Sequence, residues 1–315
     1  MPKVIEVKNL VKKYRKADKN AVDSISFEVE EGQFFALLGP NGAGKTTTIS
    51  VLTTTLAKTS GEVKIAGYDL EKQSSQVRQN VGIIFQNPSL DQNLTAEENI
   101  RFHAVLYGLY QFQPMYALMP ESYRTRVEEL AEVLGIKSEM HKPIKTFSGG
   151  MKRKLEIIRS LMHRPKVLFL DEPTTGLDPI SRRNLWEYLQ QIRKTEKITI
   201  FLTTHYLDEA ENVDKVCIIN HGQIVIEGTP TQIKRHLIKD YIEVDSKDKA
   251  KLESELSKLK LDFAKNDHFK INIPNNEVQK LLAKIRTPLN FVQTHNPTLE
   301  DAYIEIIEKG EAQVD

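Results

Sequence analysis

The eight residues from Gly39 to Thr46 have the types and spacing of a loop that binds phosphate groups. They match the pattern G-x-x-x-x-G-K-[ST] at every fixed position. Glycines let backbone N–H groups surround phosphate oxygens without a Cβ in the way. Lys45 is expected to reach the β- and γ-phosphate oxygens, and the Thr46 hydroxyl to hold Mg²⁺. The predicted nucleotide loop comprises Gly39, Pro40, Asn41, Gly42, Ala43, Gly44, Lys45 and Thr46, with Thr47 following.

Two adjacent acids, Asp171 and Glu172, follow the apolar run V-L-F-L at residues 167–170. Two acids at the end of a buried strand are costly unless they have partners or a role. Side chains alternate at a strand end, so the two carboxylates must point differently. We expect Asp171 to complete the Mg²⁺ shell and Glu172 to orient the attacking water as general base. The alternative is an ordinary strand-to-loop exit.

His205 follows a second apolar run, residues 198–202, after two threonines. A neighbouring strand could deliver it beside Glu172, and an exposed loop histidine is equally open on position alone. Together with the other motifs, a contact to the γ-phosphate is favoured.

A third motif, Ser148, Gly149 and Gly150, precedes a segment whose apolar residues have helical spacing. Ser148 is a natural N-cap, and the glycines leave the N–H groups of the helix accessible. The segment is either a capped helix or a second anion site.

These motifs need a strand before the glycine loop and a helix after it. Residues 33–38 form a candidate buried strand, and residues 46–56 a candidate helix. Strands are also predicted at 4–7 and 24–29, and the turn-prone residues 30–32 predict a hairpin between 24–29 and 33–38.

Further along the chain, strands are predicted at 62–66 and 80–85, a capping box at Thr95 to Glu98, and a helix at 124–134. Residues 167–170 and 198–202 are typical of strands inside a parallel sheet. Residues 215–219 and 223–226 flank the turn-prone residues N-H-G and predict a hairpin, with the single Cys217 buried in its first strand.

The composition changes after about residue 235, where Lys and acidic residues become frequent. Strands at 241–244 and 269–273, and helices at 249–259, 276–286 and 296–307, predict a small α+β appendage.

Composition sets limits on function. The chain has 315 residues, 40 % hydrophobic and 28 % charged, with a net charge of +1. The sequence has no long block of Lys and Arg, so a nucleic-acid surface is not indicated. A net charge near zero still leaves room for a local basic patch. The N-terminus lacks an apolar stretch of signal-peptide length, and nowhere do ~18 apolar residues run together. One cysteine excludes an intrachain disulfide and suits a reducing compartment, so a cytosolic chain is expected.

The order of these motifs over residues 3–230 resembles the nucleotide-binding domain of the ATP-binding cassette (ABC) family. The resemblance implies an α/β P-loop NTPase fold with a RecA-like core, an antiparallel β subdomain and a helical subdomain at about 87–163. It places the cassette at residues 1–235 and the α+β appendage at 236–315.

The resemblance also implies residue roles. In that family the S-G-G segment binds the γ-phosphate held by the opposing subunit, so Ser148, Gly149 and Gly150 would close on a partner's ATP. Gln86 matches the glutamine that senses Mg²⁺ and water. Tyr14 matches the aromatic that stacks on adenine, with a surface tyrosine as the alternative. The loop ending at Asp178 matches the one that crosses between the two sites.

Two departures from the family pattern stand out. Met151 replaces the usual glutamine after S-G-G, although the serine and both glycines are present. Residues 111–120 resemble an insertion into the helical subdomain, which either touches a membrane partner or is a solvent loop.

The residues around S-G-G and the acid pair, with T-L-E-D-A-Y at 298–303, resemble the drug- and polysaccharide-exporter branch, including daunorubicin-resistance-type ATPases. The resemblance implies an ATPase using ATP and Mg²⁺, a homodimer, separate permease subunits of the ABC-2 type, and a place on the cytoplasmic face of the membrane. No nucleic-acid partner is expected.

Two alternatives stay open. A soluble cassette ATPase acting on ribosomes or DNA would usually carry two cassettes or a long coiled coil, and this chain has no sustained heptads. A non-enzymatic nucleotide sensor or drug-binding self-resistance protein is disfavoured by the presence of Glu172 and His205.

Overall fold

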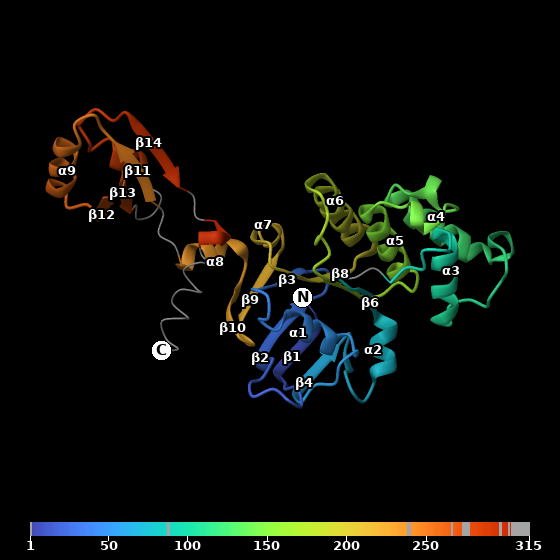
Figure 1. Ribbon diagram of the computed structural model, residues 1–315. Helices are drawn as coiled ribbons and strands as arrows, with labels where there is room; N and C mark the ends of the chain where they lie inside the picture. The colour runs from blue at the N-terminus through green and yellow to red at the C-terminus, as the bar shows by residue number, and fades with distance from the viewer. Residues whose placement is uncertain are drawn as a thin grey trace. The chain divides into compact units, whose positions relative to one another are not determined.

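The computed structural model describes residues 2–86, 89–237, 241–265, 267–272, 278–295, 298–301 and 303. It divides into two compact units, Met1–Glu227 and Gly228–Asp315 (Figure 1). The division between the two units falls somewhat before the domain boundary predicted at residue 235. That boundary stays a prediction.

A six-stranded sheet forms the centre of the first unit. Its strands stand in the order β10–β9–β3–β8–β7–β6. They are β3 (Phe34–Leu38), β6 (Val81–Ile84), β7 (Val167–Asp171), β8 (Thr199–Thr204), β9 (Lys215–Asn220) and β10 (Gln223–Gly228). The pairs of β3 with β8 and β9, and of β7 with β6 and β8, are all parallel. Every residue of β3, β7 and β8 is buried, because both faces of the sheet are covered.

A second, antiparallel sheet has the order β2–β1–β4–β5, from β1 (Lys3–Lys12), β2 (Val22–Glu30), β4 (Ser60–Ile65) and β5 (Tyr68–Asp69). The predicted hairpin between the second and third strands is wrong. Strand β2 pairs with β1, whereas β3 enters the parallel sheet. The burial pattern explains the difference. Strand β2 buries one face only and β3 buries both, so the turn at residues 30–32 carries the chain from one layer to the next.

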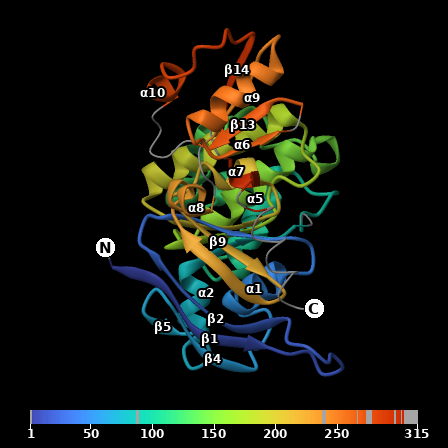
Figure 2. The same ribbon diagram turned by 90° about the vertical axis from the view of Figure 1, so that its left-hand side faces the viewer.

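The two sheets enclose the main apolar core. Helices α1 (Lys45–Leu52) and α2 (Ser74–Asn80) lie on the side of the antiparallel sheet, as both Figure 1 and Figure 2 show. Phe27 of β2 stacks on Phe35 of β3 with ring centroids 5.4 Å apart, and Phe35 stacks on Phe201 of β8 at 5.1 Å. Alternate side chains of the parallel strands therefore face the antiparallel sheet.

Helices α5 (Gly149–Leu161) and α6 (Pro179–Glu196) lie on the opposite side of the parallel sheet. Trp186 of α6 stacks on Phe34 of β3 with a centroid distance of 5.1 Å. The sequence analysis did not predict α6 or α2. A short helix, α7 (Leu207–Ala210), follows β8.

Along the chain, a helical region follows β6 and precedes β7. It contains α3 (Ala96–Leu106), α4 (Glu121–Val133) and the 3₁₀ turns η1 (Tyr116–Leu118), η2 (Lys137–Glu139) and η3 (Ile144–Thr146). The predicted capping box is confirmed, since the Thr95 hydroxyl accepts from the Glu98 N–H while the Glu98 carboxylate accepts from the Thr95 N–H. In the proposed insertion, Phe112 stacks on Phe102 at 5.8 Å and Met119 is buried.

The second unit is an α+β structure, as predicted. Its four antiparallel strands stand in the order β12–β13–β11–β14. The elements are α8 (Pro230–Leu237), β11 (Tyr241–Asp245), α9 (Lys249–Lys258), β12 (Phe263–Lys265), β13 (Phe269–Asn272), α10 (Val278–Leu282) and β14 (Phe291–His295). It has an apolar cluster of its own, which includes Ile242, Leu252 and Phe269. The predicted helix at 296–307 lies mostly outside the described residues.

Among the residues that the structure describes, no helix has both the length and the apolar composition that crossing a bilayer requires.

Candidate nucleotide site

The register of the parallel sheet brings four of the predicted motifs to one edge. Adjacent strands end level with one another, in the pairs Leu38–Thr204, Thr203–Asp171 and Leu170–Ile84. The glycine loop, Glu172, His205 and Gln86 each follow one of these ends within two residues. The carboxyl edge of an open α/β sheet is where ligands generally bind, so this edge is the candidate site.

The glycine loop connects β3 to α1 and has room for backbone only at Gly39 and Gly44. Gly44 is the N-cap of α1 with φ +108°, and a Cβ there would lie 2.5 Å from the carbonyl oxygen of Ala21. A Cβ on Gly39 would lie 2.3 Å from the carbonyl oxygen of Ile219. Glycine is therefore required at both positions, and the loop keeps its N–H groups available at the N-terminus of α1.

Lys45 is buried at the base of this loop, with 4 % of its surface exposed. Its Nζ donates to the carbonyl oxygens of Gly39 at 2.9 Å and Pro40 at 3.1 Å. It also lies 3.4 Å from Oε1 of Glu172. A buried ammonium needs such partners. The side chain thus connects the loop to the acid pair.

Asp171 is almost fully buried and accepts two hydroxyl hydrogen bonds. Thr203 Oγ1 donates to its Oδ1 at 2.6 Å, and Thr46 Oγ1 donates to the same atom at 3.4 Å. Burial raises the pKa of Asp171, and the bonds from Thr203 and Thr46 only partly offset this. Carboxylate and hydroxyl oxygens are hard ligands of the kind that Mg²⁺ prefers.

Glu172 has φ +44°, in the left-handed region that costs a non-glycine residue about 1 to 3 kcal/mol. Its N–H donates to Thr203, to the carbonyl oxygen at 3.2 Å and to Oγ1 at 3.1 Å. These bonds hold the backbone in a turn that points the carboxylate differently from that of Asp171. Thr203 is thus a site residue that the sequence analysis did not assign, although its position directly after an apolar run was a signal.

Four side chains converge on the carboxylate of Glu172. Nδ1 of His205 lies 3.3 Å and Nζ of Lys45 3.4 Å from Oε1. Oε2 accepts from Nε2 of Gln86 at 3.4 Å and from Oγ1 of Thr175 at 3.3 Å. Three of these four side chains were predicted site residues. The structure therefore gathers Lys45, Gln86 and His205 around the expected general base.

The electrostatics favour an ionised Glu172. Burial acts to raise the pKa of its carboxyl, but the hydrogen bond from His205 and the charge of Lys45 outweigh burial. The resulting pKa lies below the ordinary value, so the group can accept a proton near neutral pH. The ring of His205 packs on Tyr206 at 4.1 Å, which helps to hold its orientation.

Tyr14 lies beside the start of α1. Its hydroxyl lies 3.3 Å from Oγ1 of Thr47, and 45 % of its surface is exposed. An exposed ring next to the loop is compatible with adenine stacking and equally with a surface tyrosine, so this role stays a prediction.

The S-G-G segment is a separate helix N-terminus. Ser148 is the N-cap of α5, where its Oγ accepts from the N–H of Met151 at 3.2 Å. Asp178 caps α6, accepting from the N–H groups of Ile180 and Ser181 at 3.0 Å each. A small pocket of about 100 Å³ lies between the two helix starts. Within the described parts of the chain, no hydrogen bond or ion pair joins Ser148, Gly149 or Gly150 to the glycine loop.

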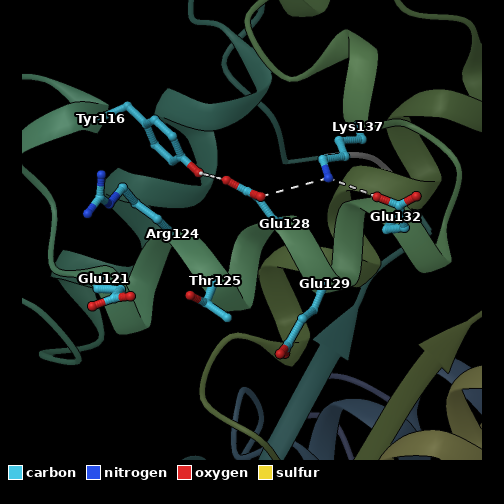
Figure 3. Close-up of a pocket in the computed structure, with 8 residues that line it drawn as sticks. All are labelled: Tyr116, Glu121, Arg124, Thr125, Glu128, Glu129, Glu132 and Lys137. Carbon is cyan, nitrogen blue, oxygen red and sulfur yellow. Dashed lines mark hydrogen bonds and ion pairs between the residues drawn. The ribbon is translucent and has the colours of Figure 1, made fainter.

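A larger surface pocket, of about 510 Å³, lies along α4 and contains none of the motif residues (Figure 3). Four glutamates line it together with Arg124 and Lys137. Figure 3 shows the carboxylate of Glu128 between the Tyr116 hydroxyl, at 3.3 Å, and the Lys137 ammonium, at 3.8 Å. An excess of carboxylates repels a triphosphate, so this pocket is not a second candidate for the nucleotide.

Comparison with known proteins agrees with this site. The sequence profile of the family described as "ABC transporter" matches residues 22–175. The probable multidrug ABC transporter ATP-binding protein YbhF of Escherichia coli (strain K12) is 38 % identical over 238 residues, 75 % of this chain and 39 % of that protein. The Nod factor export ATP-binding protein I of Burkholderia lata is 34 % identical over 312 residues, 96 % of each chain. The chain therefore spans well under half of the first relative and nearly all of the second.

Among solved structures, cbiO1 from Clostridium perfringens, described as part of the ABC transporter complex cbiONQ, is 28 % identical. It superposes with a TM-score of 0.66 over 74 % of this chain and 91 % of that chain.

Proposed function

Since the chain belongs to the ABC transporter family, we propose that it is an ATP-binding and ATP-hydrolysing subunit that powers a membrane exporter. The observation that carries the proposal is the convergence of Lys45, Gln86 and His205 on the carboxylate of Glu172, beside a glycine loop. A protein that only bound nucleotide would not need this base, whose pKa is lowered by His205 and Lys45 and whose backbone is held at a positive φ.

The glycine loop and Lys45 bind the phosphates of ATP. N–H groups from the loop and from the first turn of α1 would donate to the β- and γ-phosphates, and the Lys45 ammonium, which donates to the Gly39 carbonyl oxygen, would exchange it for phosphate oxygens. The oxygens of Thr46 and Asp171, 3.4 Å apart, suit Mg²⁺, with Gln86 as the third residue of this set. Bound there, Mg²⁺ would offset the negative charge of the phosphates.

Glu172 acts as the general base. Its ionised carboxylate accepts a proton from the attacking water, whose oxygen bonds to the γ-phosphorus as the bond to the β-phosphate oxygen of ADP breaks. Gln86 and Thr175 hold Oε2, and His205 and Lys45 hold Oε1, so the carboxylate is positioned before the reaction. We propose that His205, whose Nδ1 lies 3.3 Å from Oε1 of Glu172, also contacts the γ-phosphate.

The complete ATP site is formed by two chains. The S-G-G segment offers a helix N-terminus that makes no described bond to the glycine loop of its own chain. In a homodimer, each segment would close on ATP held by the partner's loop, and Asp178 would lie in the segment that crosses between the sites. Hydrolysis removes this contact to the γ-phosphate and lets the dimer open, a population shift driven by the difference in affinity for ATP and ADP.

The transported substrate would be handled by separate membrane-spanning permease subunits, with this chain on the cytoplasmic face. The helical region exposes apolar side chains suited to a partner, namely Phe102 at 39 %, Leu106 at 84 %, Phe112 at 52 % and Met115 at 58 %. Two of them lie in the insertion at 111–120. The relatives' names, multidrug and Nod factor export, support an export role. We propose drugs, lipids or polysaccharide as the exported substrate.

Affinity capture of the tagged chain from detergent-solubilised membranes of its own cells tests the exporter proposal. We expect a multi-span membrane protein to co-purify and to raise ATP turnover. A chain that hydrolyses ATP but co-purifies with ribosomes instead would contradict the exporter role while leaving the ATPase role in place.

A further inference from the structure

Helix α5, which begins at the S-G-G segment, holds the main chain of residues 81–86 and of Ser89 through a row of polar side chains. Arg153 donates to the carbonyl oxygens of Phe85 and Gln86, and Glu156 accepts from the N–H of Ser89. Arg159 donates to the carbonyl oxygen of Ser89, and Ser160 donates to that of Ile83. His163, just beyond the helix, bonds to the carbonyl oxygen of Val81. The spacing of the row places it along one side of the helix. None of these residues was assigned by the sequence analysis.

Arg153 is the member of this row nearest to the S-G-G segment and has the most bonds. Its NH1 donates to Phe85 O at 2.7 Å and its NH2 to Gln86 O at 3.2 Å. Its Nε donates to Pro173 O at 3.0 Å. With only 4 % of its surface exposed, the guanidinium is a buried bridge between the loop that carries Gln86 and the loop that carries Glu172.

The bridge is satisfied electrostatically as well. Oε2 of Glu156 lies 2.9 Å from NH1 of Arg153 and 3 residues further along α5, so the buried charge has a buried partner. Removing one partner of such a pair leaves an uncompensated charge. The planar guanidinium of arginine can donate hydrogen bonds to carbonyl groups in three directions, whereas the single nitrogen of lysine cannot hold the same geometry.

From this geometry we infer that Arg153 is a positioning residue that couples the two ATP sites of a dimer. The inference rests on the proposed function. The N-terminus of α5 meets the ATP held by the partner chain, while Gln86 and Glu172 act on the ATP held by Arg153's own chain. Because the guanidinium bonds to the main chain of both catalytic loops, a movement of α5 also moves these loops. Binding at one site therefore sets the geometry for hydrolysis at the other.

Mixed dimers in which only one chain can hydrolyse ATP test this inference. Two differently tagged copies are combined, one of them carrying Glu172→Gln, and Arg153→Lys is placed in either copy. We expect Arg153→Lys in the hydrolysing copy to lower kcat about 10- to 100-fold, the range that a small misplacement of catalytic groups costs, with KM little changed. When Arg153→Lys is placed in the Glu172→Gln copy instead, kcat should change less than about 2-fold.

The two arrangements distinguish positioning from mere support of α5. If Arg153 only shaped the S-G-G end of its helix, the loss would appear when Arg153→Lys is in the Glu172→Gln copy, because that copy's segment covers the active ATP. Any of three results would overturn the inference: a loss confined to that arrangement, equal losses in both arrangements, or no loss in either. Exposed Arg78 on α2 supplies the matched control, Arg78→Lys, which should leave kcat unchanged.

ATP affinity measured by equilibrium titration serves as the folding control, because it depends on the glycine loop. Should Arg153→Lys fail this control, Glu156→Gln replaces it, since the amide removes the charge that compensates the guanidinium and leaves one oxygen for the two donors, Arg153 and the N–H of Ser89. The same pattern, a loss confined to the hydrolysing copy, is then required. Wild-type dimers measured alongside separate this inference from its premise. If they show no turnover, the proposed function fails and the inference with it. If only the Arg153 pattern fails, the ATPase stands.

Discussion

The two candidate anion-binding regions of this chain differ in how complete they are. At the carboxyl edge of the parallel sheet, the polar groups of the glycine loop and the acid pair bond to one another across four strands. At the start of α5, the described side-chain bonds of the S-G-G segment are limited to the cap that Ser148 makes for its own helix. The first region has the groups of the proposed reaction already assembled, whereas the second offers only a capped helix N-terminus. This contrast supports the two-chain mechanism that we propose.

The largest expected effect is in the reaction centre. Glu172→Gln keeps the size of the side chain and removes the base, so ATP turnover should fall about 10²- to 10⁴-fold while ATP still binds. A steady-state phosphate-release assay and an equilibrium titration measure the two quantities. Normal turnover in this variant would remove Glu172 from the mechanism.

Lys45→Ala tests the phosphate-binding part of the same region. Loss of a charge-assisted hydrogen bond costs about 1.5 to 3 kcal/mol, which corresponds to about 10- to 100-fold in ATP affinity. Fluorescence titration with an ATP analogue would measure it. Unchanged affinity would refute the role of Lys45.

Gly149→Asp tests the second region without touching the first. A Cβ at Gly149 meets only Leu177, at 3.6 Å, and an acid in the first turn suits the helix dipole, so α5 should be retained. The new charge would repel a partner's γ-phosphate. We expect turnover to fall about 10-fold or more while ATP affinity of the single chain stays within about 2-fold. Gly149→Ala is the neutral control. Equal turnover in both variants would show that the segment does not face phosphate.

A smaller effect is expected in the pH dependence. The pKa of Glu172 is raised by burial and lowered more strongly by His205 and Lys45. Removing the histidine in His205→Ala should therefore raise this pKa, and the acid limb of the kcat profile should move to higher pH, since only the ionised carboxylate accepts the proton. A His205→Ala profile that coincides with the wild-type profile on the acid side would contradict the assigned contact.

Sequence reasoning succeeded where the information is local. The glycine loop, the acid pair and the Thr95 capping box are defined by neighbouring residues, and the family and fold class that they implied are confirmed by the structure and the comparisons. The roles assigned to individual site residues remain predictions.

It failed where the partner is distant in sequence. The hairpin expected between β2 and β3 was wrong because strand pairing depends on which sheet each strand can enter. Thr203 and Arg153 were missed because their importance comes from the backbone opposite them, at Glu172 in one case and at Phe85 in the other. The apolar run before Thr203 indicates a strand end, but neighbouring residues do not specify which main chain lies opposite a side chain.

The central claim is that one copy holds half of each ATP site. Purified Glu172→Gln chain, measured by light scattering after size-exclusion chromatography, tests it most directly. The account predicts a dimer with saturating Mg²⁺ and ATP, and a monomer with ADP or with Gly149→Asp added. A chain that stays monomeric under saturating ATP, alone and with its permease present, would contradict the account.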